Sequence, residues 1–112
     1  MSTPLQVFKA EFFKALGHPL RIRILEVLVG GERSVQELQE ALDLDQPIVS
    51  QHLAMLRAKG IVKARKEGTT VRYALRDVSI GELLTVARRI VDSQLIDAQT
   101  MLRELRRGGR RR

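Results

Sequence analysis

The chain has 112 residues, of which 44% are hydrophobic and 29% charged, and its formal net charge is +7. Such a length and balance are typical of one compact globular domain with a modest core. The sequence contains no cysteine, which excludes disulfides, thiolate metal sites and thiol redox sensing within this chain. No apolar run is long enough to span a membrane, and the N-terminus lacks the basic-then-apolar pattern of a signal peptide. We therefore expect a cytoplasmic protein.

The positive charge is concentrated in two stretches of the chain. Residues 45–76 carry seven basic and two acidic groups, and residues 103–112 carry six and one. A localised basic surface indicates a polyanionic partner. Membrane binding, the competing interpretation, would require basic residues beside exposed large apolar side chains. Residues 45–76 contain neither Trp nor Phe, so no membrane partner is expected.

Two helices are predicted before residue 30. The first covers residues 4–16, and its apolar stripe is made by Leu5, Phe8, Phe12 and Leu16. Packing in the core accounts for this stripe, although a second chain could cover the apolar surface that remains. The second helix covers residues 20–29 and follows a break at Gly17-His18-Pro19, where His18 is expected to be a turn or capping residue.

A pair of shorter helices follows, joined by a turn. Ser34 and Glu37 form a capping box that opens a helix to Leu42. After a turn over residues 43–45, a second helix covers residues 46–59, capped by Asp45 or Gln46 and ended by Gly60. Two helices joined in this way predict a helix-turn-helix unit.

The second of these helices has an uncharged polar leading end and basic residues in its last turn. An ordinary amphipathic surface helix would share its buried stripe of Val49, Leu53 and Leu56. Its leading end suits base edges in the DNA major groove, whereas the cations Arg57 and Lys59 suit phosphates. The residues predicted to meet base edges are Gln46, Pro47, Ser50 and Gln51.

After Gly60 the pattern changes to the alternation of a β-hairpin. Strands are predicted over residues 61–66 and 70–75, with a turn at residues 67–69. Arg65, Lys66 and Arg72 therefore gather near the tip. A charged hairpin can simply be a solvated edge. Directly after a helix-turn-helix, however, it can act as a wing over DNA phosphates.

A long helix is predicted from a capping box at residues 79–82 to about residue 107. One apolar row repeats every seven residues, and a companion row runs beside it: Leu84, Val91, Ala98 and Leu105 with Leu95 and Leu102. A domain this small cannot cover both these rows and a second apolar face, so we predict a symmetric homodimer. The predicted dimer interface comprises Leu5, Phe8, Leu84, Val91, Leu95, Ala98 and Leu102. The predicted domain covers residues 1–107, and residues 108–112 form a basic tail.

Taken in order, these elements resemble the ArsR/SmtB family of dimeric winged-helix transcriptional repressors. The resemblance spans about residues 12–77 and is carried most specifically by residues 50–62, Ser-Gln-His-Leu-Ala-Met-Leu-Arg-Ala-Lys-Gly-Ile-Val, with the Gly-Thr-Thr-Val-Arg-Tyr run at residues 68–73. It implies a mainly α fold with a small β-hairpin, that is, a homodimeric winged helix-turn-helix. It also implies backbone contacts from His52 and Arg57, and wing contacts from Arg65, Lys66, Thr69 and Arg72.

The chain departs from the family at its metal sites. Ser34, Gln36 and Gln39 stand where arsenite-sensing members carry cysteines, and no histidine follows His52. We therefore predict no metal site and no cofactor, although a weak site that uses His18 and His52 stays open.

The predicted function is that of a sequence-specific DNA-binding regulator, with repression favoured, that binds an inverted repeat of double-stranded DNA as a dimer. The alternatives are a regulator that responds to nickel, zinc or a small ligand through a non-standard site, and an activator or protein-interaction partner. The sequence does not identify an effector. No catalytic residues are predicted either, because the sequence holds no nucleophile–base–acid set and no phosphate-binding loop.

Overall fold

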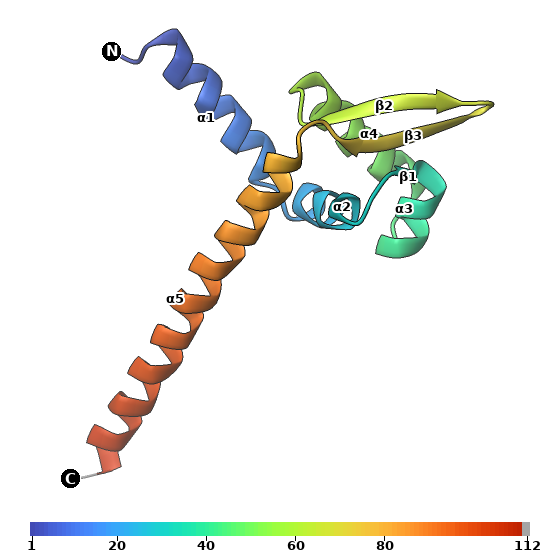
Figure 1. Cartoon of the computed structure of the whole chain (residues 1–112). Coiled ribbons are helices and arrows are strands. Elements are labelled where there is room, and N and C mark those ends of the chain that lie inside the picture. Colours follow the sequence, from blue (N-terminus) through green and yellow to red (C-terminus); the bar gives the residue numbers. More distant parts are fainter. Residues whose placement is uncertain (111–112) are drawn as a thin grey trace. The chain divides into compact units, whose positions relative to one another are not determined.

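The computed structural model describes residues 1–110, and it divides the chain into two compact units, Met1–Gly81 and Glu82–Arg112. The helices and strands of the described residues are drawn in Figure 1. In chain order they are α1 (Pro4–Leu16), α2 (Pro19–Val29), β1 (Arg33–Ser34), α3 (Val35–Leu42), α4 (Gln46–Ala58), β2 (Val62–Glu67), β3 (Thr70–Leu75) and α5 (Val78–Arg110). This order confirms the predicted winged helix-turn-helix.

Local capping interactions fix where the first three helices begin. Thr3 accepts a hydrogen bond from the Gln6 amide at the start of α1, and His18 Nδ1 accepts one from the Leu20 amide at the start of α2. At α3 the predicted capping box is confirmed. Ser34 Oγ accepts from the Glu37 amide, and the Glu37 carboxylate accepts from the Ser34 amide.

Helix α4 begins at Gln46 as predicted and ends at Ala58, one residue before the predicted end, and its predicted side-chain cap is not formed. Asp45 is its N-cap residue, yet neither the Asp45 nor the Gln46 side chain caps the first amides. Pro47 in the first turn removes one amide that would otherwise need a partner. After Lys59, Gly60 takes a φ of +71°, a left-handed conformation that suits glycine and turns the chain into the hairpin.

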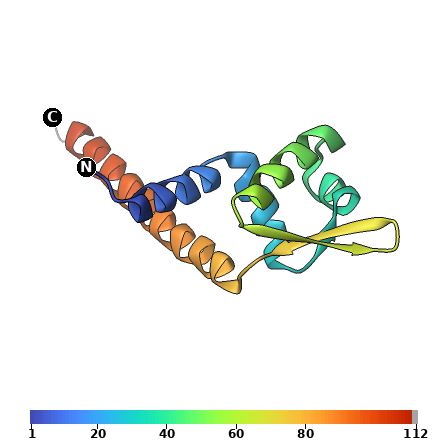
Figure 2. The same ribbon diagram turned by 90° about the horizontal axis from the view of Figure 1, so that it is seen from above.

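The hairpin is confirmed, and it belongs to an antiparallel sheet with the strand order β1-β3-β2. β2 runs one residue further than predicted, so that Glu67 pairs with Thr70 across a two-residue turn. The short strand β1 was not predicted. It pairs Arg33 with Tyr73 and Ser34 with Arg72, which places the start of α3 beside the hairpin. In Figures 1 and 2, β2 and β3 project as a hairpin past α3.

Helix α5 differs from the prediction at both ends. It begins at Val78, and the Asp77 carboxylate accepts a hydrogen bond from the Ser79 amide. The predicted capping box at Ser79 is therefore wrong, because Ser79 is already helical. The helix continues to Arg110, beyond the predicted end near residue 107. Part of the predicted basic tail is thus helical, and the last two residues of the tail lie outside the described residues.

The core of the first unit is made by the helices α2, α3 and α4 and by the start of β2. Its fully buried side chains include Ile24, Leu25, Leu38, Val49, Leu53, Leu56 and Ile61. In α1 only Ala15 and Leu16 are buried, whereas Leu5 and Phe8 are 62% and 72% exposed. The prediction that core packing accounts for the α1 stripe is therefore wrong for its first half, because only the end of α1 reaches the core.

Candidate nucleic-acid interface

The leading end of α4 presents an uncharged polar surface. Gln46, Pro47 and Gln51 are exposed, and Ser50 is half-buried. Gln46 Nε2 donates a hydrogen bond of 2.7 Å to Ser50 Oγ, one turn further along the helix. Among the described residues, no side chain or backbone group forms a hydrogen bond with the Gln46 amide oxygen or with the Gln51 side chain. Amide side chains of this kind can both donate and accept, as base edges require.

The opposite face of α4 anchors this surface to the core. Val49, Leu53 and Leu56 have no exposed area. At the end of the helix, the Ile61 amide donates to the Leu56 carbonyl at 2.9 Å, which ties the following chain to the last turn. Because its buried stripe is held in this way, α4 is a rigid element, and its polar end is kept at the surface.

His52 lies on a third side of α4, half-buried against α2. Its Nδ1 accepts a hydrogen bond from Arg21 Nε at 3.3 Å, and its ring centre lies 4.5 Å from that of His18. Burial lowers the pKa of His52, and the nearby charges of His18 and Arg21 lower it further. These surroundings thus favour the neutral form of His52, which joins α4 to α2. Its predicted contact with the DNA backbone stays a prediction.

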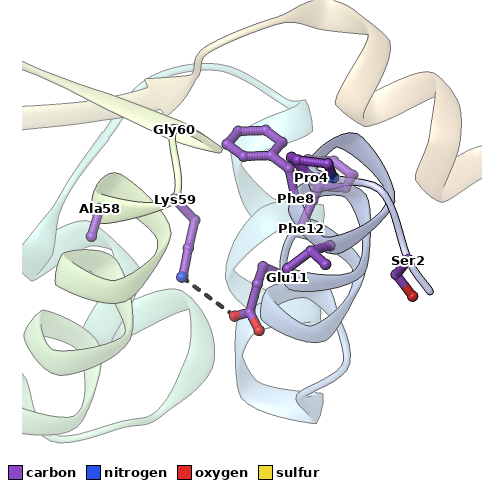
Figure 3. A pocket seen from close by; sticks show the side chains of 9 residues that line it. Ser2, Pro4, Phe8, Glu11, Phe12, Ala58, Lys59 and Gly60 are labelled. Carbon is purple, nitrogen blue, oxygen red and sulfur yellow. Dashed lines mark hydrogen bonds and ion pairs between the residues drawn. The ribbon is translucent and has the colours of Figure 1, made fainter.

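The two basic residues at the end of α4 differ in their contacts. Arg57 is exposed in the last turn, as a phosphate contact requires. Lys59, which the sequence also suggested for phosphates, forms an ion pair of 3.5 Å with Glu11 of α1. This pair borders an apolar groove of about 710 Å³ between α1 and the end of α4, lined by Phe8 and Phe12 among others (Figure 3).

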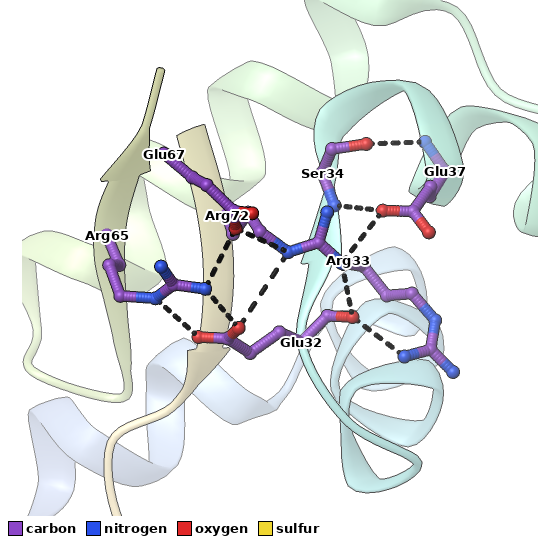
Figure 4. Close-up of polar contacts among 7 residues, drawn as sticks. All are labelled: Glu32, Arg33, Ser34, Glu37, Arg65, Glu67 and Arg72. Atoms are coloured by element: carbon purple, nitrogen blue, oxygen red, sulfur yellow. Dashed lines mark hydrogen bonds and ion pairs between the residues drawn. The ribbon is translucent and has the colours of Figure 1, made fainter. Parts of the chain in front are cut away.

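The hairpin carries Arg65 within a cluster of carboxylates (Figure 4). Arg65 Nη2 lies 2.8 Å from one carboxylate oxygen of Glu32, and Nε lies 3.2 Å from the other. The same Nη2 also lies 3.0 Å from Glu67. The hydrogen bond with Arg65 lowers the pKa of Glu32 and, in return, raises the pKa of Arg65. Arg65 is therefore engaged by two acidic groups of its own chain.

Arg72, the cross-strand neighbour of Arg65, joins the hairpin to α3. Its Nη2 lies 3.2 Å from the Glu37 carboxylate, and its Nε lies 3.7 Å from Glu32 and 3.8 Å from Glu67. The hydrogen bonds with Ser34 lower the pKa of Glu37, and the Arg72 charge adds to this effect. The capping residue of α3 is therefore also the partner of a predicted wing residue.

Lys66 and Thr69 differ from the two arginines. Both are exposed near the hairpin tip, and Lys66 forms no ion pair among the described residues. The structure thus brings Arg65 and Arg72 into one cluster and leaves Lys66 outside it. The sequence pattern does not reveal Glu32 as a partner of Arg65, because 33 residues of chain separate the two. Only the pairing of β1 with β3 brings the two together.

Over residues 1–110, no three His, Asp or Glu side chains gather closely enough to hold a metal ion, so the absence of a metal site stays a prediction. Over the same range, no helix is both long and apolar enough to cross a membrane.

Comparison with known sequences identifies the family. A family profile described as "Bacterial regulatory protein, arsR family" matches residues 18–64. Rv0081 of Mycobacterium tuberculosis, an HTH-type transcriptional regulator, is 47% identical over 109 residues, which are 96% of each chain. The chain belongs to the ArsR family. It is a transcriptional regulator with a winged helix-turn-helix DNA-binding domain.

Other ArsR-type relatives carry more specific names. A probable mercury resistance operon repressor of Streptomyces lividans is 39% identical, covering 70% of this chain and 63% of its own. The transcriptional activator HlyU of Vibrio cholerae is 40% identical, covering 69% and 71%. These names include both signs of regulation.

Solved structures of the ArsR family share this fold. The crystal structure of Rv0081 matches with a TM-score of 0.79, covering 86% of this chain and 97% of that one. The winged helix-turn-helix domain Mb0332 of Mycobacterium bovis, described as homodimeric, matches with a TM-score of 0.75 at 31% identity, covering 81% and 84%.

Proposed function

We propose that this ArsR-family protein is a homodimeric repressor that recognises an inverted-repeat operator through α4. The observation that carries the proposal is the exposed, uncharged polar end of a helix whose other face is fully buried. In this proposal Gln46, Pro47, Ser50 and Gln51 meet base edges. The residues proposed for the DNA backbone are His52, Arg57, Arg65, Lys66, Thr69 and Arg72.

The proposal of a dimer rests on apolar side chains that each unit leaves exposed. In α1 these include Leu5 and also Phe8, which lines the groove of Figure 3. In α5, Val91, Leu95 and Leu102 are each at least half exposed. Together with Leu84 and Ala98 they follow the spacing of a helix that pairs with another helix. The homodimeric description of Mb0332 supports the same arrangement.

Repression is favoured because relatives include named repressors of Streptomyces lividans and Xylella fastidiosa. The activator HlyU keeps activation as the competing sign. Transcription from a reporter that carries the operator, measured with and without the protein, tests the sign, and repression predicts less transcription when the protein is present. Increased transcription would overturn the repressor part of the proposal and leave operator recognition intact.

Base recognition is tested by the double substitution of Ser50→Ala with Gln51→Ala. Genomic fragments that the protein binds would first supply an operator. A base contact contributes about 1–3 kcal/mol of discrimination, so the double variant should lose at least roughly tenfold of its preference for operator over random duplex. Lys66→Ala is the control, since a phosphate contact weakens binding to both duplexes about equally. An unchanged preference in the double variant would show that α4 is not the recognition helix.

The dimer is tested by Val91→Glu, which places a charge in the predicted seam. Sedimentation should show monomers, because a buried unpaired charge is strongly unfavourable. Ile96→Glu is the matched control. Ile96 is also more than half exposed, but the helical period places it on the far side of α5 from Val91. Equal behaviour of the two variants would contradict the proposed seam.

A further inference from the structure

We propose that Glu32 and Glu67 compete with DNA phosphates for Arg65, so that Arg65 contacts DNA through Nε and Nη2 only after it exchanges its carboxylate partners for phosphate. This inference rests on the proposed function, because it assumes that the hairpin lies over the DNA backbone. It assigns to two acidic residues a role that the charge pattern of residues 45–76 does not reveal. Their effect is to limit binding to duplexes of any sequence.

The geometry of the pair supports this competition. Two donors of Arg65 meet the two oxygens of Glu32 at 2.8 and 3.2 Å, as in a bidentate guanidinium–carboxylate pair. Glu67 accepts from the same Nη2 at 3.0 Å, a bond drawn in Figure 4. A guanidinium binds phosphate through the same fork of donors that it offers to a carboxylate. Donors already used by Glu32 must therefore leave it before they can bind a phosphate oxygen.

The position of the pair in water makes the exchange feasible. The side chains of Arg65, Glu32 and Glu67 are 54%, 36% and 60% exposed. Ion pairs in such positions are weak, because water screens them. Arg65 can thus leave its carboxylates without unfolding the hairpin. The exchange involves only the guanidinium group, the two carboxylates and a phosphate, so its effect does not depend on base sequence.

Arg72 has a different role in the same cluster. Its side chain is 27% exposed, and its partner Glu37 is held in place by two hydrogen bonds with Ser34 at the start of α3. The Arg72–Glu37 pair therefore anchors the hairpin to the helix-turn-helix. The cluster thus contains one anchoring pair, Arg72 with Glu37, and one exchangeable set, Arg65 with Glu32 and Glu67, whose carboxylates also lie 3.7 and 3.8 Å from Arg72 Nε.

A double-mutant cycle tests the proposal with the full-length protein and a random-sequence duplex. Affinity is measured by fluorescence anisotropy for the natural protein, Glu32→Gln with Glu67→Gln, Arg65→Ala, and the three changes combined. The carboxylate variant should bind the duplex about two- to fivefold more tightly, the scale of an exposed ion pair. In the Arg65→Ala background the same two changes should have no such effect.

The control is the variant Glu26→Gln with Glu40→Gln, which changes the net charge equally. Both residues are exposed on helices, and neither forms an ion pair among residues 1–110. A smaller gain in the control supports the proposal, as does a gain that disappears without Arg65. Thermal unfolding of each variant shows whether it is folded.

Three results would overturn the exchange. The gain could persist without Arg65, which would indicate only long-range repulsion. The carboxylate variant could bind less tightly, which would show that Glu32 and Glu67 position Arg65 for DNA, or its affinity could stay unchanged. The proposed function has a separate readout. If the natural protein preferred no duplex, that function would fail, whereas a normal operator preference with no Arg65-dependent gain would overturn the exchange alone.

Discussion

The two parts of the candidate interface are held in opposite ways. Helix α4 is anchored by side chains with no exposed area and presents uncharged groups at its leading end. The outer half of the hairpin buries little apolar surface, since Val71 is 37% exposed, and charged contacts tie this half to β1 and α3, whereas Val62 at the base of the hairpin belongs to the core. The groups proposed to discriminate bases thus have a rigid support, whereas those proposed to contact phosphates are held by weak, exchangeable bonds.

The largest expected effect breaks the support of α4. Leu53→Ala should lower the free energy of unfolding by about 2–5 kcal/mol, because it removes a fully buried side chain and leaves a cavity. Val71→Ala, the matched change in the hairpin, should cost much less, since Val71 is partly exposed. Urea denaturation of both variants measures the difference. Equal losses would show that the hairpin depends on apolar packing as much as α4 does.

A smaller effect is expected at two glycines, one after the end of α4 and one in the turn of the hairpin. Gly60 and Gly68 have φ values of +71° and +61°, in which an alanine is strained by about 1–2 kcal/mol. Gly60→Ala should lower the free energy of unfolding by about this amount, because Gly60 connects α4 to β2. Gly68→Ala is strained in the same way, but it should lower the free energy of unfolding less, because the exposed tip of residues 66–69 can shift to relieve the strain. If Gly68→Ala proved the more destabilising in thermal unfolding, the tip would be the more constrained position.

The smallest expected effect is the dependence of stability on pH, because the titratable groups of α4 and of the hairpin cluster act in different pH ranges. The folded pKa of His52 lies below 6.5, so the unfolded chain takes up a proton first as the pH falls. Stability should therefore fall as the pH drops below about 6.5, and His52→Gln should reduce this fall. The carboxyls of Glu32 and Glu37 also have lowered pKa values, so their contribution should be lost only below about pH 4.5.

Urea denaturation at pH 7.5, 5.5 and 4 would resolve these two windows. A fall between pH 7.5 and 5.5 that is the same in His52→Gln would contradict the assignment to His52. The variant Glu32→Gln should match the natural protein in that upper window and differ from it only at pH 4.

Much of the fold followed from interactions between near neighbours in the chain. The capping box of Ser34 and Glu37, the glycine after α4 and the change of apolar period after Gly60 all act within a few residues. The predicted starts of α1 and α4 were also correct, and each of these helices has a proline in its first turn. The start of α5 was not, because Ser79 and Asp77 offer competing caps and only the bond between Asp77 and the Ser79 amide forms.

The order of the elements, the absence of cysteine chemistry and the polar end of α4 thus follow from composition and local spacing. Which charges meet depends instead on how the folded chain brings distant segments together. Arg21 reaches His52 across 31 residues of chain, and Arg65 reaches Glu32 across 33. The tertiary structure also leaves Phe8 exposed, although its helical stripe looks like core. The physical reason is that periodicity fixes the face on which a side chain lies, whereas burial and pairing depend on what the rest of the chain brings against that face.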